Sequence, residues 1–126
     1  MDLQIRARKI ELTTALRGLI ERRLGFALGR FGHRVQEVTI RLDDLNGPRG
    51  GMDKRCWIRA AVVPSGDLTV ETRDDEIESA ISRAADRIAR RVKKALDRRR
   101  AMRGRERRRM SLDSVDEDRP EPAEYR

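Results

Sequence analysis

Four segments of the chain alternate between apolar and polar residues, which is the pattern of a strand with one buried face. In chain order they cover residues 2–8, 38–42, 56–63 and 68–73. In the second, Val38, Ile40 and Leu42 alternate with Thr39 and Arg41. Between these segments, glycine, proline and charged residues predict a long flexible loop over 43–55 and a tight turn over 64–67.

Two other segments carry apolar residues at the spacing of an amphipathic helix. The first is predicted to begin at an N-cap, Thr13 or Thr14, and to end near Leu28, before Gly29 and Gly32. The second is predicted to begin after Asp75 as N-cap, with a glutamate three residues on. Its apolar sector contains Ile77, Ile81, Ala84, Ile88, Val92 and Ala95.

The elements follow one another as β-α-β-β-β-α. Two amphipathic helices can cover one face of a four-stranded sheet, so the predicted fold class is α+β, a two-layer sandwich with both helices on one face. The other face of the sheet then stays open. The alternation assigns to that face Arg6, Arg8, Arg41, Trp57, Arg59 and Arg73.

Charge is concentrated in one part of the sequence. The whole chain has a formal net charge of +8, but residues 83–109 alone hold 14 Lys or Arg and three Asp or Glu. Helical spacing places five of these cations on one flank of the second helix: Arg83, Arg87, Arg90, Lys94 and Arg98. Because few acids are available to pair with them, this segment favours a polyanion such as nucleic acid as its partner.

Other classes of protein find little support in the sequence. Cys56 is the only cysteine, so no internal disulfide can form, and a reducing cytoplasm fits. No apolar run is long enough to span a membrane, and residues 1–5 do not resemble a signal peptide. His33 stands alone, so no metal site is expected. No nucleophile–base pair or carboxylate dyad is evident, so we expect neither an enzyme, a cofactor nor a small-molecule substrate.

Five short stretches together resemble the bacterial ribosome hibernation-promoting factors and ribosome-associated translation inhibitors. They are residues 8–16 (RKIELTTAL), 22–25 (RRLG), 64–66 (PSG), 74–81 (DDEIESAI) and 85–94 (ADRIARRVKK). The resemblance covers roughly residues 1–100. It implies a fold similar to double-stranded RNA-binding domains. It also implies binding in the decoding region of the small ribosomal subunit, where the protein blocks messenger and transfer RNA and silences idle ribosomes.

The resemblance also implies which residues face ribosomal RNA. The matching positions are Arg8, Lys9, Arg22, Arg23, Arg83, Arg87, Arg90, Arg91 and Lys94, and Arg98 continues their row. The loop after the second strand is longer than in many members of the family. The dimerisation domain of the long members has no counterpart here, so we expect a short form that is a monomer off the ribosome. Residues 1–100 are predicted to form the RNA-binding domain, and 101–126 a basic extension with a disordered acidic tail from Ser111.

Several alternatives stay open. Gly47–Gly50 matches a GXXG string but would join two strands, so it is either a plain turn or a basic finger in which Arg49, Lys54 and Arg55 reach phosphates. Trp57 is either an edge residue that covers apolar surface or a platform for a base. Besides a ribosome silencer, a general structured-RNA-binding module and a regulator that binds a protein through the basic helix remain candidate functions.

Overall fold

The structure is a computed structural model that describes residues 1–45 and 53–116, the last seven of them as backbone only. The elements are β1 (Asp2–Arg8), α1 (Thr14–Leu28), the 3-10 helix η1 (Gly29–Arg34), β2 (Val35–Asp44), β3 (Lys54–Val62), β4 (Gly66–Asp74) and α2 (Ile77–Asp116). This order confirms the predicted β-α-β-β-β-α fold. The chain falls into two compact units, Met1–Lys93 and Lys94–Arg126, and the fold described below is that of the first.

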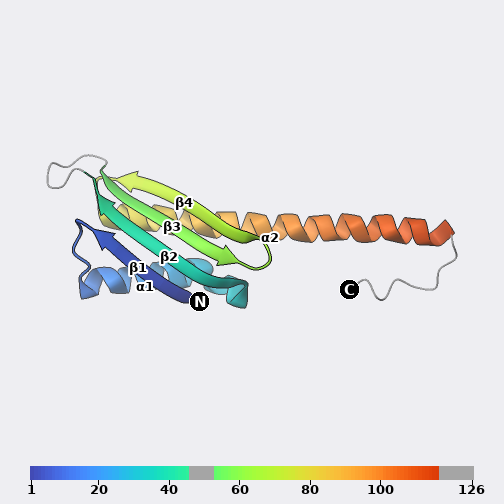
Figure 1. Ribbon diagram of the computed structural model, residues 1–126, viewed down its shortest axis with the longest axis horizontal. Helices are drawn as coiled ribbons and strands as arrows, with labels where there is room; N and C mark the ends of the chain where they lie inside the picture. The colour runs from blue at the N-terminus through green and yellow to red at the C-terminus, as the bar shows by residue number, and fades with distance from the viewer. Residues whose placement is uncertain (46–52, 117–126) are drawn as a thin grey trace. The chain divides into compact units, whose positions relative to one another are not determined.

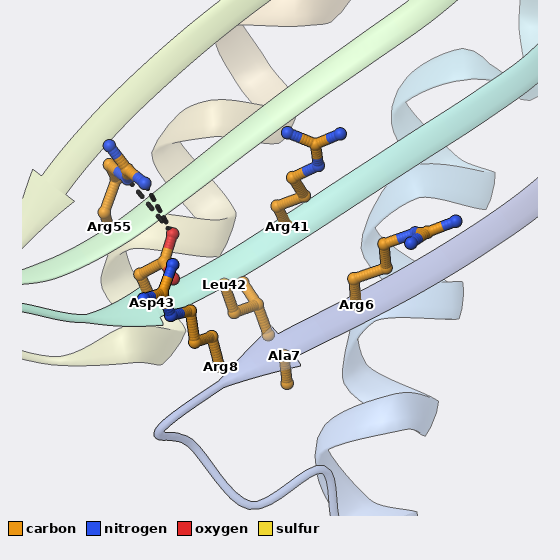
Figure 2. A pocket seen from close by; sticks show the side chains of 7 residues that line it. All are labelled: Arg6, Ala7, Arg8, Arg41, Leu42, Asp43 and Arg55. Carbon is orange, nitrogen blue, oxygen red and sulfur yellow. Dashed lines mark hydrogen bonds and ion pairs between the residues drawn. The ribbon is translucent and has the colours of Figure 1, made fainter.

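The four strands form one mixed sheet in the order β1-β2-β3-β4. β1 runs parallel to β2, and the other two pairs are antiparallel. A parallel pair needs a crossover connection, which α1 provides. α1 and the start of α2 lie on the same face of the sheet (Figures 1 and 2). We call this the helix side and the opposite face the open side.

The core lies between the sheet and the two helices. Its fully buried members include aliphatic residues and one cysteine: Ile20, Leu24, Leu28, Val38, Ile40, Leu42, Cys56, Ile58, Ile81, Ala84, Ile88 and Val92. Each buried leucine or isoleucine contributes about 1.5–3 kcal/mol, and this burial stabilises the two layers. A hydrogen bond of 2.7 Å from the Thr72 hydroxyl to the Ala80 carbonyl oxygen joins β4 to α2 within this core.

The first helix begins and ends near the predicted residues. The Thr13 hydroxyl accepts a hydrogen bond of 3.1 Å from the Leu16 amide, so Thr13 rather than Thr14 is the N-cap. Gly29 keeps a helical conformation and is the first residue of η1, so α1 continues into η1 without a break. The change of direction comes at Gly32, whose φ of 60° suits glycine, and β2 follows three residues later.

Two predicted segments have wrong boundaries, and ion pairs explain the error in the first, the loop after the second strand. Residues 43–55 were expected to form a loop, but both ends of that segment are strand, because Asp43 and Asp44 of β2 stand opposite Arg55 and Lys54 of β3. The pairs close at 2.6 Å (Arg55 Nη2 to Asp43 Oδ2) and 3.3 Å (Lys54 Nζ to Asp44 Oδ2). Charges that suggest a loop in the sequence thus extend the hairpin. Residues 46–52, which contain the GXXG string, lie outside the described residues.

The second helix differs from its prediction at both ends. It begins at Ile77, and the carboxylate that accepts the Glu76 amide belongs to Asp74 (3.2 Å), so Asp75 is not the N-cap. The helix continues to Asp116, so residues 111–116, expected to be disordered, are helical. Extending an existing helix needs no new nucleation, and sequence composition alone does not reveal this. The rest of the expected tail, 117–126, lies outside the described residues.

Candidate nucleic-acid interface

The basic flank of α2 is exposed because the opposite flank is buried. Ala84, Ala85, Ile88 and Val92 face the core, and the arginines between them point away from it. Within the first unit the exposed members are Arg83, Arg87, Arg90 and Arg91. Lys94 and Arg98 belong to the second unit and are also exposed.

Arg83 and Arg87 bind the edge of the sheet. Arg83 Nη1 donates to the Arg73 carbonyl oxygen at 2.8 Å and to Asp74 Oδ2 at 3.3 Å, and Arg87 Nη1 donates to the Glu71 carbonyl oxygen at 3.0 Å. An edge strand leaves such carbonyls unpaired, and the two guanidinium groups satisfy them. Each guanidinium has five N–H donors, so both retain donors for a ligand while their stems are already fixed.

Arg90 and Arg91 differ from that pair. Within the part of the chain that the structure describes, neither has a hydrogen bond or an ion pair, and both are exposed. They are therefore the α2 cations of the first unit that are most available to an external anion.

Asp74, at the end of β4, and the neighbouring Asp75 form a connected group with Arg83. A hydrogen bond from the Asp75 carboxyl lowers the pKa of Asp74, and the Glu76 amide and the Arg83 guanidinium lower it further. The same pairing raises the pKa of Asp75. Asp74 thus stays ionised beside Arg83 and helps to hold its guanidinium against β4.

A second group of predicted residues gathers where β1 ends. Arg8 and Lys9 are exposed, and Lys9 has a φ of 62°, a conformation that is costly for a residue with a Cβ atom. They line a cavity of about 140 Å³ together with Asp43, Asp44 and Arg55. The fold thereby brings the predicted strand–helix junction next to a residue predicted to lie in the loop. Arg22 and Arg23 are exposed on α1.

The two described candidates for the basic finger are held in ion pairs. Burial acts to lower the pKa of Lys54, but hydrogen bonds to Asp44 and Asp53 outweigh it and raise the pKa. The hydrogen bond to Asp43 raises the pKa of Arg55. Both residues lie in β3 rather than in a loop, so their side chains are positioned by acids of the hairpin. Arg49 lies outside the described residues.

The open side of the sheet carries a cluster of arginines, of which the sequence analysis predicted only Arg8 as an RNA contact. Arg6, Arg8 and Arg41 surround a cavity of about 280 Å³ next to the Asp43–Arg55 ion pair (Figure 2). Alternation had placed these arginines on the open face, but only the parallel register sets Arg6 directly opposite Arg41. Trp57 lies in the same row on the interior strand β3, so its interpretation as an edge residue is wrong.

Other classes of site find little support in the described residues. Among the described residues, no group of three or more histidine, cysteine, aspartate or glutamate side chains could hold a metal ion. None of the described helices contains an apolar stretch that could cross a bilayer. Burial raises the pKa of the Cys56 thiol to about 12, which makes it a core residue without nucleophilic character.

Together these features define a small basic α+β domain whose exposed cations suit a polyanion. A sequence-family model described as sigma 54 modulation protein / S30EA ribosomal protein matches residues 3–100, and the chain belongs to this family of ribosome-associated proteins. The resemblance inferred from the sequence is thereby confirmed. A comparison with curated proteins found no match.

Two solved structures share the fold. The N-terminal domain of Protein Y from Thermus thermophilus is 26% identical, with a TM-score of 0.59 over 75% of this chain and 98% of that one. A ribosomal subunit interface protein from Coxiella burnetii is 14% identical, with a TM-score of 0.61 over 75% of this chain and 96% of that one. The second likeness concerns the fold alone.

Proposed function

We propose that this protein binds the small ribosomal subunit in its decoding region and keeps messenger and transfer RNA out, so that the ribosome is silent. The exposed cations of α2, fixed on a packed helix, carry this proposal. Membership in a family of ribosome-associated proteins supports it. The protein would act in the cytoplasm, as a monomer, on idle bacterial ribosomes, and without catalysis or a cofactor.

The mechanism rests on preorganised phosphate contacts. Arg87, Arg90 and Lys94 recur at helical spacing along α2, so they can follow one stretch of RNA backbone. The Arg87 stem is already ordered by its hydrogen bond to β4, which reduces the entropy lost on binding. Further contacts would come from the other positions that the family resemblance implies, namely Arg8, Lys9, Arg22, Arg23, Arg83, Arg91 and Arg98. Silencing then follows from occupancy, because two ligands cannot fill the same channel.

Co-sedimentation with purified small subunits tests the proposal. We expect saturable binding that transfer RNA displaces at concentrations that fill its own sites, and that an equal mass of bulk double-stranded RNA displaces much less. Equal competition by the two RNAs would replace the proposal with a general structured-RNA-binding module. This runner-up is favoured by one observation: Arg90 and Arg91 have no hydrogen-bond or ion-pair partner among the described residues, so they can contact phosphates of any sequence. Binding that neither RNA competes for would indicate a protein partner.

A further inference from the structure

The open side of the sheet is basic at one end only. Cross-strand register places Arg6, Arg41, Trp57 and Glu71 in one row across the four strands, and Arg8, Asp43, Arg55 and Arg73 in the next. Successive rows on one face lie about 7 Å apart. At the other end of the same face, the row containing Asp2, Glu37 and Asp67 is acidic. A polyanion would therefore occupy the end near Arg6 and Arg8.

The acids within the two basic rows are already paired. Asp43 accepts from Arg55 Nη2 at 2.6 Å and from Arg55 Nε at 3.2 Å. Glu71 Oε2 lies 3.5 Å from Arg73 Nε. Among the described residues, no carboxylate lies within ion-pair distance of Arg6, Arg8 or Arg41, and all three are exposed. Three unpaired guanidinium groups thus surround the cavity of about 280 Å³ (Figure 2).

Placing Arg6 directly opposite Arg41 has an energetic cost for the free protein. Like charges that face each other across neighbouring strands destabilise a sheet. An anion between the two guanidinium groups removes that repulsion, and a phosphate matches their fork of donors. The cluster is therefore better suited to the bound state than to the free state.

Trp57 indicates which class of anion this cluster can bind. The Arg41 guanidinium carbon lies 4.7 Å from the centre of the Trp57 ring, and that of Arg59 lies 5.9 Å from it. These cation–π contacts hold Arg41 beside the cavity before any ligand arrives. The half-buried indole and the guanidinium planes also offer surfaces on which an unpaired base can stack. Bases inside a duplex are not accessible in this way, so the face favours a single strand.

We propose that the open side of the sheet is a second RNA-binding surface, which takes a single-stranded segment with a phosphate between Arg6, Arg8 and Arg41 and an adjacent base near Trp57. This surface is separate from the α2 flank that carries the proposed function. A chain with both surfaces can hold two RNA segments at once, one against the helix and one against the sheet.

Trp57 is the only tryptophan of the chain, so its fluorescence reports on this face alone. The probe is an eight-nucleotide single-stranded oligouridylate, titrated at fixed salt into the full chain. Binding is followed by anisotropy of the labelled RNA and by Trp57 emission with the unlabelled RNA. The test variant carries Arg6→Gln and Arg41→Gln and keeps Arg8, because Arg8 is also among the proposed ribosomal contacts. The matched control carries Arg105→Gln and Arg107→Gln, which remove the same charge from exposed positions of α2 in the second unit.

We expect saturable binding that changes Trp57 emission in the wild-type chain. The sheet variant should bind at least about tenfold more weakly and lose the emission change, because charge-assisted contacts are lost. The control variant should bind more weakly but keep the full emission change at saturation. A thermal unfolding curve verifies that each variant is folded.

Four results would overturn the proposal. The first is that the RNA causes no emission change in the wild-type chain, and the second is that both variants bind equally weakly and retain the emission change. The third is that inorganic phosphate, at matched phosphate concentration, causes the same emission change. The fourth is that an acidic peptide of eight glutamates binds as tightly as the RNA. Failure of the proposed function can be distinguished from failure of this proposal. Substitutions on the sheet weaken binding of the oligonucleotide, whereas substitutions of the α2 cations weaken binding to the small subunit.

Discussion

Cys56 and Trp57 are neighbours in the sequence, yet they belong to opposite sides of the sheet. Cys56 is fully buried on the helix side among aliphatic residues, whereas Trp57 is half-buried on the open side beside two arginines. Position by position along β3, one side provides the stability of the fold and the other provides charge. The two sides should therefore respond differently to substitution: changes on the helix side should alter folding, and changes on the open side should alter binding.

The basic flank of α2 is an exception to this division, because it lies in the helix layer but carries charge. Its arginines combine both roles, since Arg83 and Arg87 bind β4 carbonyl oxygens and still have donors to spare. On the open side the corresponding anchor is aromatic, because Arg41 stacks on Trp57. Both surfaces thus present arginines whose stems are ordered in the free protein.

The largest effect is expected from reversing the α2 charges. Replacing Arg87, Arg90 and Lys94 by glutamate should weaken binding to small subunits by roughly a thousandfold or more, because three charge-assisted contacts become repulsions. The measurement is co-sedimentation. The same reversal at Arg105, Arg107 and Arg108 is the matched control and should cost less. If the control proves more damaging, the distal arginines are the main anchor and the ordered flank is not.

Salt should separate an RNA partner from a protein partner. With about six phosphate contacts, affinity for the small subunit should fall by roughly a thousandfold between 50 and 200 mM salt, because each contact releases counterions. Binding titrations at four salt concentrations give the slope. A nearly flat slope would contradict RNA contacts as the basis of small-subunit binding.

The reactivity of Cys56 should reveal how closed the helix side is. A pKa of about 12 means that only about one thiol in ten thousand is ionised at pH 8, so a soluble aromatic disulfide should react thousands of times more slowly than with a free cysteine. Raising the pH towards 12 increases the thiolate fraction and hence the rate. Fast labelling of the folded protein at pH 8 would show that the helix side opens. An aqueous quencher should reach Trp57 in the same sample.

Truncation on the two sides of β3 should have unequal effects on stability. Ile58→Ala should lower the free energy of unfolding by about 2–5 kcal/mol, because it leaves a cavity in the core. Arg59→Ala, one residue further along, should cost less than about 1 kcal/mol, since it removes one exposed cation–π contact. Urea unfolding of the two variants provides the comparison. Equal losses would mean that the open side also contributes to the core.

The smallest effect is expected from relieving the repulsion on the open side. Arg6→Gln should raise the free energy of unfolding by a few tenths of a kcal/mol, because its guanidinium no longer faces that of Arg41. The gain should shrink as salt screens the charges. A clear loss of stability would indicate that Arg6 has a structural partner, and would weaken the case for an anion site.

The sequence determined the elements whose signals are local. Apolar alternation identified four strands and helical periodicity two helices, because burial of one face follows directly from those two periods. The excess of arginine over acid predicted a polyanion partner, and the order of short stretches identified the family. The same local signals failed where charged residues form part of a strand, as at Lys54 and Arg55, because their partners lie across the hairpin.

Only the tertiary structure decided which charges are available. In the sequence, Arg55 and Arg41 are equivalent cations, but the fold places Asp43 beside Arg55 and Trp57 beside Arg41. It also turns Arg83 and Arg87 onto the edge of β4 while Arg90 stays unpaired among the described residues. Strand pairing and helix packing set these distances, and electrostatic energy depends on distance and burial more than on the number of charges. The sequence therefore predicted an anion-rich partner, whereas the register of the sheet decided which cations of the open side stand next to one another.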